Sequence, residues 1–185
     1  HTRLQGEWSS DVCSSDLSHT PEQRIFETIP AETVYREFSD TPHGVSRAIT
    51  ADFDGNGRQD AAIFYRATQN AEQLTLKVRL SHQGVLDLQR PEISTPSLHA
   101  LTTGDVNGDG HLDLVGLNSQ QLLTWLNDGQ GNFSPTTPID LGLAVGDQVA
   151  QLNLGDVDGD GHLDACFFRS QGYGWRDYFV YYGNG

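Results

Sequence analysis

Short apolar runs recur along this chain, separated by loops rich in glycine, aspartate and asparagine. In the stretch 74–81, LTLKVRLS, every second residue is apolar, a two-residue period typical of a β-strand with one buried face. Helical periodicity is absent after residue 40. The segment 32–38 is expected to end a preceding blade, with a short helix as the alternative. Equivalent arms are expected at three places: LTLKVRLS at 74–81, LLTWLND at 122–128 and YFVYYGN at 178–184. The pattern predicts an all-β fold.

The strand signals group into units of about fifty residues, each with roughly four short strands. A first strand (RAITA at 47–51, LHALTT at 98–103, VAQLNL at 149–154) precedes a polar loop, and a second apolar run follows it. The long arm and an irregular, proline-containing segment complete each unit. Repeats of this length and strand number are typical of β-propeller blades. We therefore expect part of a β-propeller built from four-stranded antiparallel blades, with units at 47–97, 98–148 and 149–185 and the end of a preceding blade at 18–46.

The polar loop is nearly the same in all three units. It reads DFDGNGRQD at 52–60, DVNGDGHLD at 105–113 and DVDGDGHLD at 156–164, and the first aspartates are 53 and 51 residues apart. Oxygen-bearing side chains occupy positions 1, 3, 5 and 9, and glycines at positions 4 and 6 allow a tight fold. Hard cations such as Ca²⁺ prefer six to eight oxygen ligands. The loops predict up to three Ca²⁺ sites.

The candidate ligands follow from the shared positions. Position 7 (Arg58, His111, His162) is expected to contribute its backbone carbonyl, which leaves its side chain free to vary. The side-chain ligands expected are Asp52, Asp54, Asn56 and Asp60 in the first loop, Asp105, Asn107, Asp109 and Asp113 in the second, and Asp156, Asp158, Asp160 and Asp164 in the third. Thiolate or imidazole metals fit poorly, because no loop contains a cysteine or a second histidine.

Two other interpretations of the loops compete with this kind of Ca²⁺ site. An EF-hand needs a bidentate glutamate at position 12, but Ile63, Gly116 and Phe167 stand there, and the following residues indicate strands. The alternative that remains is an acidic glycine-rich turn that binds nothing. If metal binds, the first loop is expected to be the weakest site, because Arg58 lies beside it, and the four-aspartate third loop the tightest.

The net charge of −14 is largely local to these loops. Ten of the 25 acidic residues lie in them, and three Ca²⁺ ions would reduce the charge to −8. This acidity argues against nucleic acid or an anionic membrane as a partner. No apolar run approaches the length of a membrane span.

Several residues outside the loops carry separate expectations. Residues 1–17 match no repeat and resemble a translated adapter oligonucleotide, so they are expected to be foreign to the fold. Cys166 is expected to be a buried small hydrophobe, with a reactive or paired thiol as the alternative. Five aromatic residues are expected in the core between blades, with sugar stacking as the alternative: Phe53, Phe64, Trp125, Phe133 and Tyr181.

The segments GDVNGDGHLDLVGL and GDVDGDGHLDACFF, followed by WLNDGQGNFS and YYGNG, resemble the FG-GAP/VCBS repeat. That resemblance covers about 45–185 and is weaker in the first unit, where SHQGV replaces the GNG turn. It implies a propeller with one Ca²⁺ site in the hairpin loop of each blade, as in integrin α-chains and bacterial surface proteins. Because such propellers usually have about seven blades, the chain is expected to be a fragment.

The expected function is a calcium-stabilised extracellular or cell-surface module that binds a protein or glycan, with structural metal sites. The first alternative is the propeller part of a secreted polysaccharide-active enzyme, since paired carboxylates can act as acid and base. Against it, no GxSxG-type nucleophile motif is present, and His111 and His162 are expected to face solvent. The second alternative is a structural spacer in a large surface or toxin-like protein.

Overall fold

The computed structural model describes residues 44–82, 85–89, 91–144, 146–171 and 175–183. The adapter-like segment 1–17, the possible helix at 32–38 and all but the last residues of 18–46 lie outside the described residues. The described part is all-β, and every paired strand is antiparallel to its neighbour. Within it, no helix has the length and apolar character needed to cross a bilayer.

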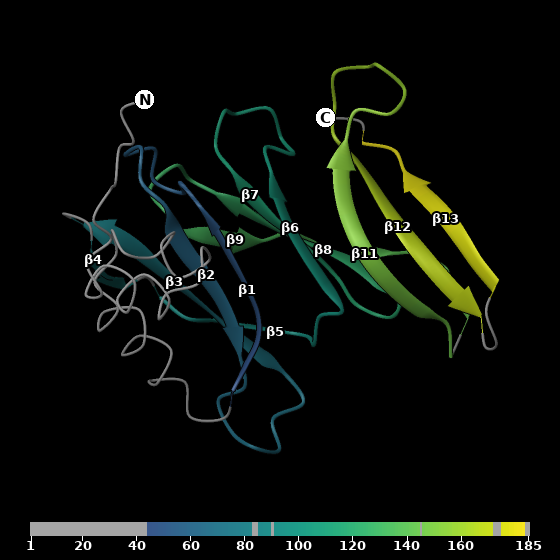
Figure 1. Ribbon diagram of the computed structural model, residues 1–185, viewed down its shortest axis with the longest axis horizontal. Helices are drawn as coiled ribbons and strands as arrows, with labels where there is room; N and C mark the ends of the chain where they lie inside the picture. Colours follow the sequence, from purple (N-terminus) through teal and green to yellow (C-terminus); the bar gives the residue numbers. More distant parts are fainter. Residues whose placement is uncertain (1–43, 83–84, 90, 145, 172–174, 184–185) are drawn as a thin grey trace, which may run out of the picture.

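In the described part of the chain, thirteen strands form three separate sheets (Figure 1). The first sheet contains β1 (Val45–Ala51), β2 (Asp60–Tyr65), β3 (Leu74–His82), β4 (Val85–Gln89) and β5 (Ile93–Thr95). The second contains β6 (Ala100–Gly104), β7 (Asp113–Leu117), β8 (Gln121–Asn127), β9 (Phe133–Pro135) and β10 (Ile139–Asp140). The third contains β11 (Gln148–Gly155), β12 (Asp164–Gln171) and β13 (Trp175–Tyr181).

The first two sheets differ from the expected four-stranded blade in one respect: two short strands share the outer edge of the third strand. In the first sheet, β4 pairs with the end of β3 from Arg79 onward, and β5 pairs with its beginning at Leu74–Leu76. In the second, β9 and β10 divide β8 in the same way. The irregular segment therefore supplies two strands instead of one, because proline interrupts its pairing: Pro91 lies between β4 and β5, and Pro138 between β9 and β10.

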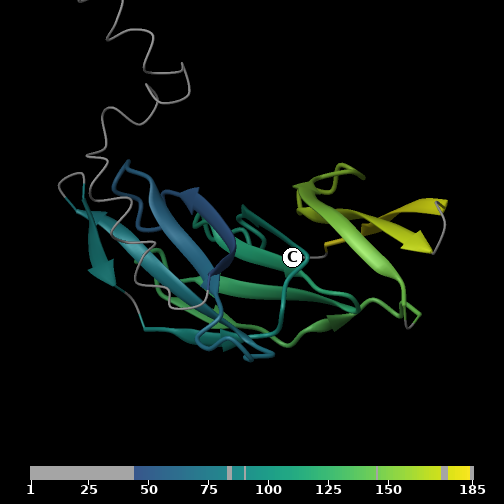
Figure 2. The same cartoon turned by 60° about the horizontal axis from the view of Figure 1, so that its bottom comes forward.

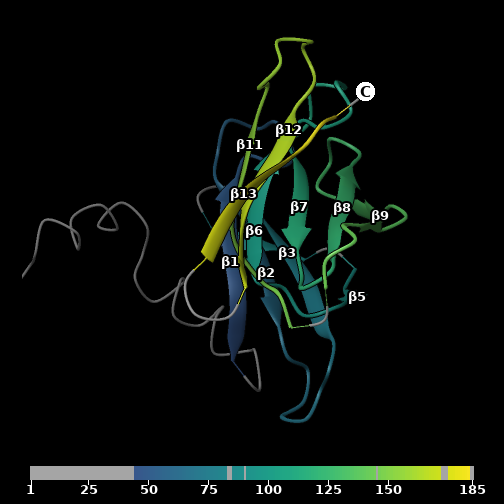
Figure 3. The same ribbon diagram turned by 90° about the vertical axis from the view of Figure 1, so that its right-hand side faces the viewer.

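The sheets are stacked face to face, as the turned views make clear (Figures 2 and 3). Alternation along each strand sends neighbouring side chains to opposite faces. In β7, Leu114 enters the core shared with the first sheet, whereas Val115 and Leu117 enter the core shared with the third. The second sheet thus contributes to both cores, and each pair of neighbouring sheets buries one core between them.

Aromatic pairs join the first and second sheets. The rings of Phe53 and Phe133 meet edge to face at 5.2 Å, and those of Phe64 and Trp125 at 5.3 Å. All four side chains are buried, which confirms their expected place between the repeating units. Such pairs contribute about 0.5–1.5 kcal/mol beyond their buried area.

Two expectations about the third sheet were wrong. Tyr181 is 40% exposed because it ends the edge strand β13 and lines an open groove of about 190 Å³ beside Leu154 and Leu163. The long arm spans Trp175–Tyr181 instead of 178–184, since its pairing with β12 already begins at Trp175 opposite Gln171. Cys166, by contrast, is buried and unpaired as expected.

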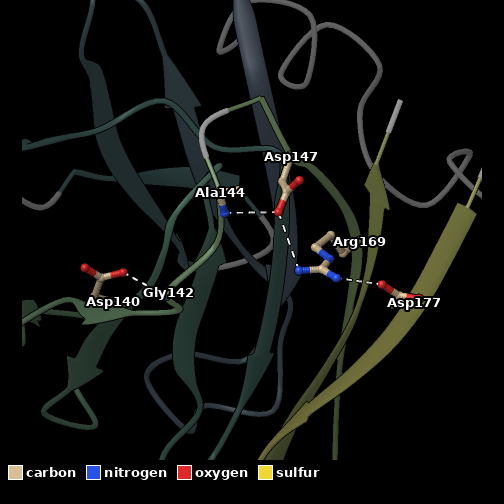
Figure 4. A network of polar contacts seen from close by, with 6 residues as sticks. All are labelled: Asp140, Gly142, Ala144, Asp147, Arg169 and Asp177. Carbon is tan, nitrogen blue, oxygen red and sulfur yellow. Dashed lines mark hydrogen bonds and ion pairs between the residues drawn. The ribbon is translucent and has the colours of Figure 1, made fainter. Parts of the chain in front are cut away.

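An arginine fixes the connection between the second and third sheets at the end opposite the acidic loops (Figure 4). Arg169 of β12 lies 2.7 Å from Asp177 of β13 and 3.6 Å from Asp147, and its guanidinium stacks 4.7 Å from the centre of the Phe179 ring. Asp147 in turn accepts a hydrogen bond from the backbone N–H of Ala144. These contacts anchor the linker before β11 to the sheet that follows it.

The core between the first two sheets provides a direct test of this packing. Replacing Trp125 by alanine is expected to lower the free energy of unfolding by about 3–5 kcal/mol, because it removes a buried ring and leaves a cavity. Tyr182→Ala is the matched control, since Tyr182 is 57% exposed and its loss should change stability by less than about 0.5 kcal/mol. Urea denaturation measures both, and equal effects would contradict the stacked arrangement.

Candidate metal centres

The three acidic loops connect the first and second strands of their sheets and lie at the same end of the array, uppermost in Figure 1. Each loop folds back on itself through the glycines at positions 4 and 6. Their φ angles are positive in every loop, at 71° and 81° for Gly55 and Gly57, a region that side chains disfavour. The same backbone path recurs at Gly108, Gly110, Gly159 and Gly161.

The aspartate at position 1 organises the turn. In the second loop, Oδ1 of Asp105 accepts the backbone N–H groups of Gly108 and Asp109 at 2.8 and 3.1 Å, and Oδ2 accepts that of Gly110 at 2.8 Å. Asp52 and Asp156 receive corresponding N–H groups in their own loops. The glycine conformation therefore aims a set of donors at one carboxylate.

Positions 3 and 5 form local turns of the Asx type, in which a side-chain oxygen accepts an N–H two residues later. At position 5, Asn56, Asp109 and Asp160 each accept the N–H of the residue at position 7, at 2.8–2.9 Å. The pKa of the Asp109 carboxyl lies below its usual value, mainly because the Asn107 amide donates to it and secondly because the His111 N–H does. The position-7 side chains of Arg58, His111 and His162 are exposed.

The aspartate at position 9 (Asp60, Asp113, Asp164; hereafter the position-9 aspartates) is fully buried in all three units. It is the first residue of the second strand, as expected. One carboxylate oxygen accepts the N–H of loop position 2, and the other accepts an N–H at the end of the third strand or, in the third unit, just beyond it. The latter donors are Ser81 at 2.7 Å, Asn127 at 2.8 Å and Gly183 at 2.9 Å.

Burial and hydrogen bonding act in opposite directions on these buried groups. For Asp60 and Asp113, loss of solvation raises the pKa of the carboxyl, and its two N–H donors only partly offset this. For Asp164, the donors Val157 and Gly183 prevail over burial and lower the pKa. A raised pKa means that ionising Asp60 and Asp113, as the pH rises through that pKa, costs folding free energy unless a cation compensates.

Three carboxylates converge in two of the loops. Asp52, Asp54 and Asp60 each bring an oxygen within 4.8 Å of the others, and so do Asp156, Asp158 and Asp164. These are positions 1, 3 and 9. The second loop has the same hydrogen-bonded path but carries Asn107 at position 3, so an amide oxygen stands where the other loops have a third carboxylate. At position 5, Asp160 is not part of the triad of its loop, and the first loop carries the neutral Asn56 there.

Sequence reasoning missed the partners of the position-9 aspartates. Ser81, Asn127 and Gly183 follow those aspartates by 21, 14 and 19 residues, so neither their spacing nor their side-chain type repeats. The sequence offered one signal of these partners: turn-forming residues follow each of the long arms, close to where the donors lie.

Residues 105–167, from the second loop through the third and into β12, match the family described as FG-GAP-like repeat. The chain carries an FG-GAP-like repeat. Comparison with curated proteins and with solved structures gave no match. The matched segment contains the second and third acidic loops and connects the second sheet to the third, which agrees with the all-β, propeller-like arrangement of the described residues.

The buried position-9 aspartate should contribute to the stability of this chain even without metal. Asp113→Ala leaves the N–H groups of Val106 and Asn127 without an acceptor, which should cost about 1–3 kcal/mol for each buried donor. Asp140→Ala is the control, because Asp140 is exposed and, among the described residues, its carboxylate accepts the N–H of Gly142 alone. Denaturation in the presence of chelator compares the two variants, and similar stabilities would show that the buried carboxylate is dispensable.

Proposed function

We propose that the acidic loops hold Ca²⁺ and that the FG-GAP chain is a metal-stabilised binding module of an extracellular or cell-surface protein. The observation that carries the metal assignment is the convergence of carboxylate oxygens within 4.8 Å in the first and third loops. Each pair of charges at that distance repels by roughly 1 kcal/mol even in a water-like dielectric, and by more as the dielectric falls. A divalent cation removes that repulsion.

The donor set fits a hard cation. Every candidate side chain offers a carboxylate or amide oxygen, and a carboxylate oxygen that already accepts one N–H retains a second lone pair for a metal. The ligands would be the residues at positions 1, 3, 5 and 9, with the backbone carbonyl of position 7. The second loop, with one fewer carboxylate at position 3, would bind more weakly than the third.

The proposed role of the metal is structural. The position-9 aspartate is tied to its loop and to the third strand, so a cation that engages it would strengthen the hairpin in the folded chain only. No loop has a position-12 glutamate, and sites of the weaker extracellular class, with Kd near 10⁻⁴–10⁻³ M, match millimolar external calcium. This supports a location outside the cell.

Binding, instead of catalysis, is the proposed activity, with a protein or a glycan as the partner. The conspicuous loop carboxylates already accept backbone N–H groups, which suits a scaffold better than an acid–base pair. Glycan-array and pull-down assays test for a partner. Turnover of a polysaccharide that is lost on changing a carboxylate outside the loops would favour an enzyme instead.

Calcium should raise the melting temperature measured by calorimetry. At a concentration ten times Kd, each occupied site adds about 1.4 kcal/mol, or a few degrees for a chain of this size. Asp156→Ala and Asp158→Ala should each remove the contribution of the third loop, because each deletes a member of its triad.

The control for this titration is Asp140→Ala, which removes an exposed carboxylate outside the loops and should leave the calcium response intact. Identical melting temperatures in calcium and in chelator would overturn the metal assignment. A response retained in full by both triad variants would place the cation elsewhere.

A further inference from the structure

The side chain of Asn127, the last residue of β8, joins two acidic loops that belong to different sheets. Its amide nitrogen donates to the carbonyl of Phe53, in the first loop, at 2.8 Å and to that of Leu112, in the second, at 3.1 Å. Its backbone N–H donates to Asp113 at 2.8 Å. Asn127 is 3% exposed, so these bonds lie in a water-poor region where each counts fully.

These contacts complete a path between two candidate ligands. The N–H of Phe53 donates to Asp60 at 2.8 Å, the carbonyl of Phe53 accepts from Asn127, and Asn127 donates to Asp113. Three hydrogen bonds of 2.8 Å therefore link the position-9 aspartates of the first and second loops. Displacing either carboxylate shifts a group that the other depends on.

The turn that follows Asn127 holds its side chain in place. The amide oxygen of Asn127 accepts the N–H groups of Gly129 and Gly131, so all four of its side-chain hydrogen-bonding directions are used. Gly131 lies against Leu80 of the first sheet, where a Cβ atom would stand 2.6 Å from a leucine methyl. The turn is thereby wedged onto the neighbouring sheet, and the amide has one orientation that satisfies every partner.

Within the described residues, the corresponding positions in the other two units make no such link between loops. Gly183 occupies the same place in the third unit and has no side chain, although its N–H donates to Asp164 in the same way. Ser81, in the first unit, receives at its carbonyl a hydrogen bond from Asn56 of its own loop. The asymmetry distinguishes the first two loops from the third.

We infer that Asn127 is a positioning residue that couples metal binding at the first and second loops, while the third loop binds independently. The inference rests on the proposed calcium function. Occupation of the second loop fixes Asp113 and with it Asn127, which holds Phe53 where its N–H supports Asp60. By linkage the effect is reciprocal, and one hydrogen bond corresponds to about a three- to tenfold change in affinity.

A site-resolved NMR titration with Ca²⁺ tests the coupling in the full chain. The amides of Gly57, Gly110 and Gly161 report on the three loops, because each donates to the position-1 aspartate of its own loop. Disabling the second loop with Asp105→Ala should weaken calcium binding at Gly57 about three- to tenfold and leave the midpoint at Gly161 unchanged. This measurement keeps Asn127 intact and does not depend on how its variants fold.

The second arm repeats the titration with Asn127→Asp, which keeps the shape and the acceptor but removes the amide donor. In that background, Asp105→Ala should no longer change the midpoint at Gly57, which a merely structural role would not predict. Asn118→Asp is the matched control: Asn118 caps the β7–β8 turn through the N–H groups of Gln120 and Gln121 and touches no acidic loop. Coupling should persist in that variant.

The outcomes separate the two proposals. If none of the three glycine amides responds to Ca²⁺, the calcium function itself fails. If they respond but Asp105→Ala leaves Gly57 unchanged, or shifts Gly161 as much as Gly57, the coupling through Asn127 is overturned. Coupling that survives Asn127→Asp assigns the link to the sheet packing and also overturns it.

Discussion

A buried carboxylate that accepts two backbone N–H groups holds each repeating unit of this chain together. It stands at the first residue of the second strand and binds the loop behind it and the third strand beside it. A buried charge without partners would be prohibitively unfavourable, so the strands are held at the one register in which both donors arrive. The stacking of the sheets adds stability between units, whereas these hydrogen bonds fix the geometry within each unit.

The loop chemistry and the packing are consequences of the same arrangement. The residue at loop position 2 gives its N–H to the buried aspartate and its side chain to the neighbouring sheet, as Phe53 does by meeting Phe133. In the third unit, the residue at loop position 2 is Val157. Its side chain is 54% exposed, because the described residues place no further sheet against it. The acidic loop is therefore both a candidate cation site and part of the contact between sheets, which is why an apolar residue stands at position 2 between two candidate metal-ligand positions.

Much of the architecture could be predicted because it follows from local patterns. The alternation of β3 predicts the buried face that Leu74, Leu76, Val78 and Leu80 form, and the repeated loop predicts where the second strands begin. The split fourth strand could not be predicted, since the prolines indicate an irregular segment but do not show which part of β3 or β8 each half of it pairs with. The exposure of Tyr181 and the role of Asn127 depend on neighbouring sheets, and no local pattern encodes such contacts.

The position-9 aspartate also explains how a chain of this kind can be lengthened. Each fifty-residue segment carries its own carboxylate, its own donors and its own two apolar faces, so copying the segment copies all the instructions for its alignment. Only the contacts at the junctions, such as those of the Asn127 amide or of Arg169, differ from one pair of neighbouring units to the next. Duplication can therefore add units without disturbing older ones, and differences between units accumulate at their borders.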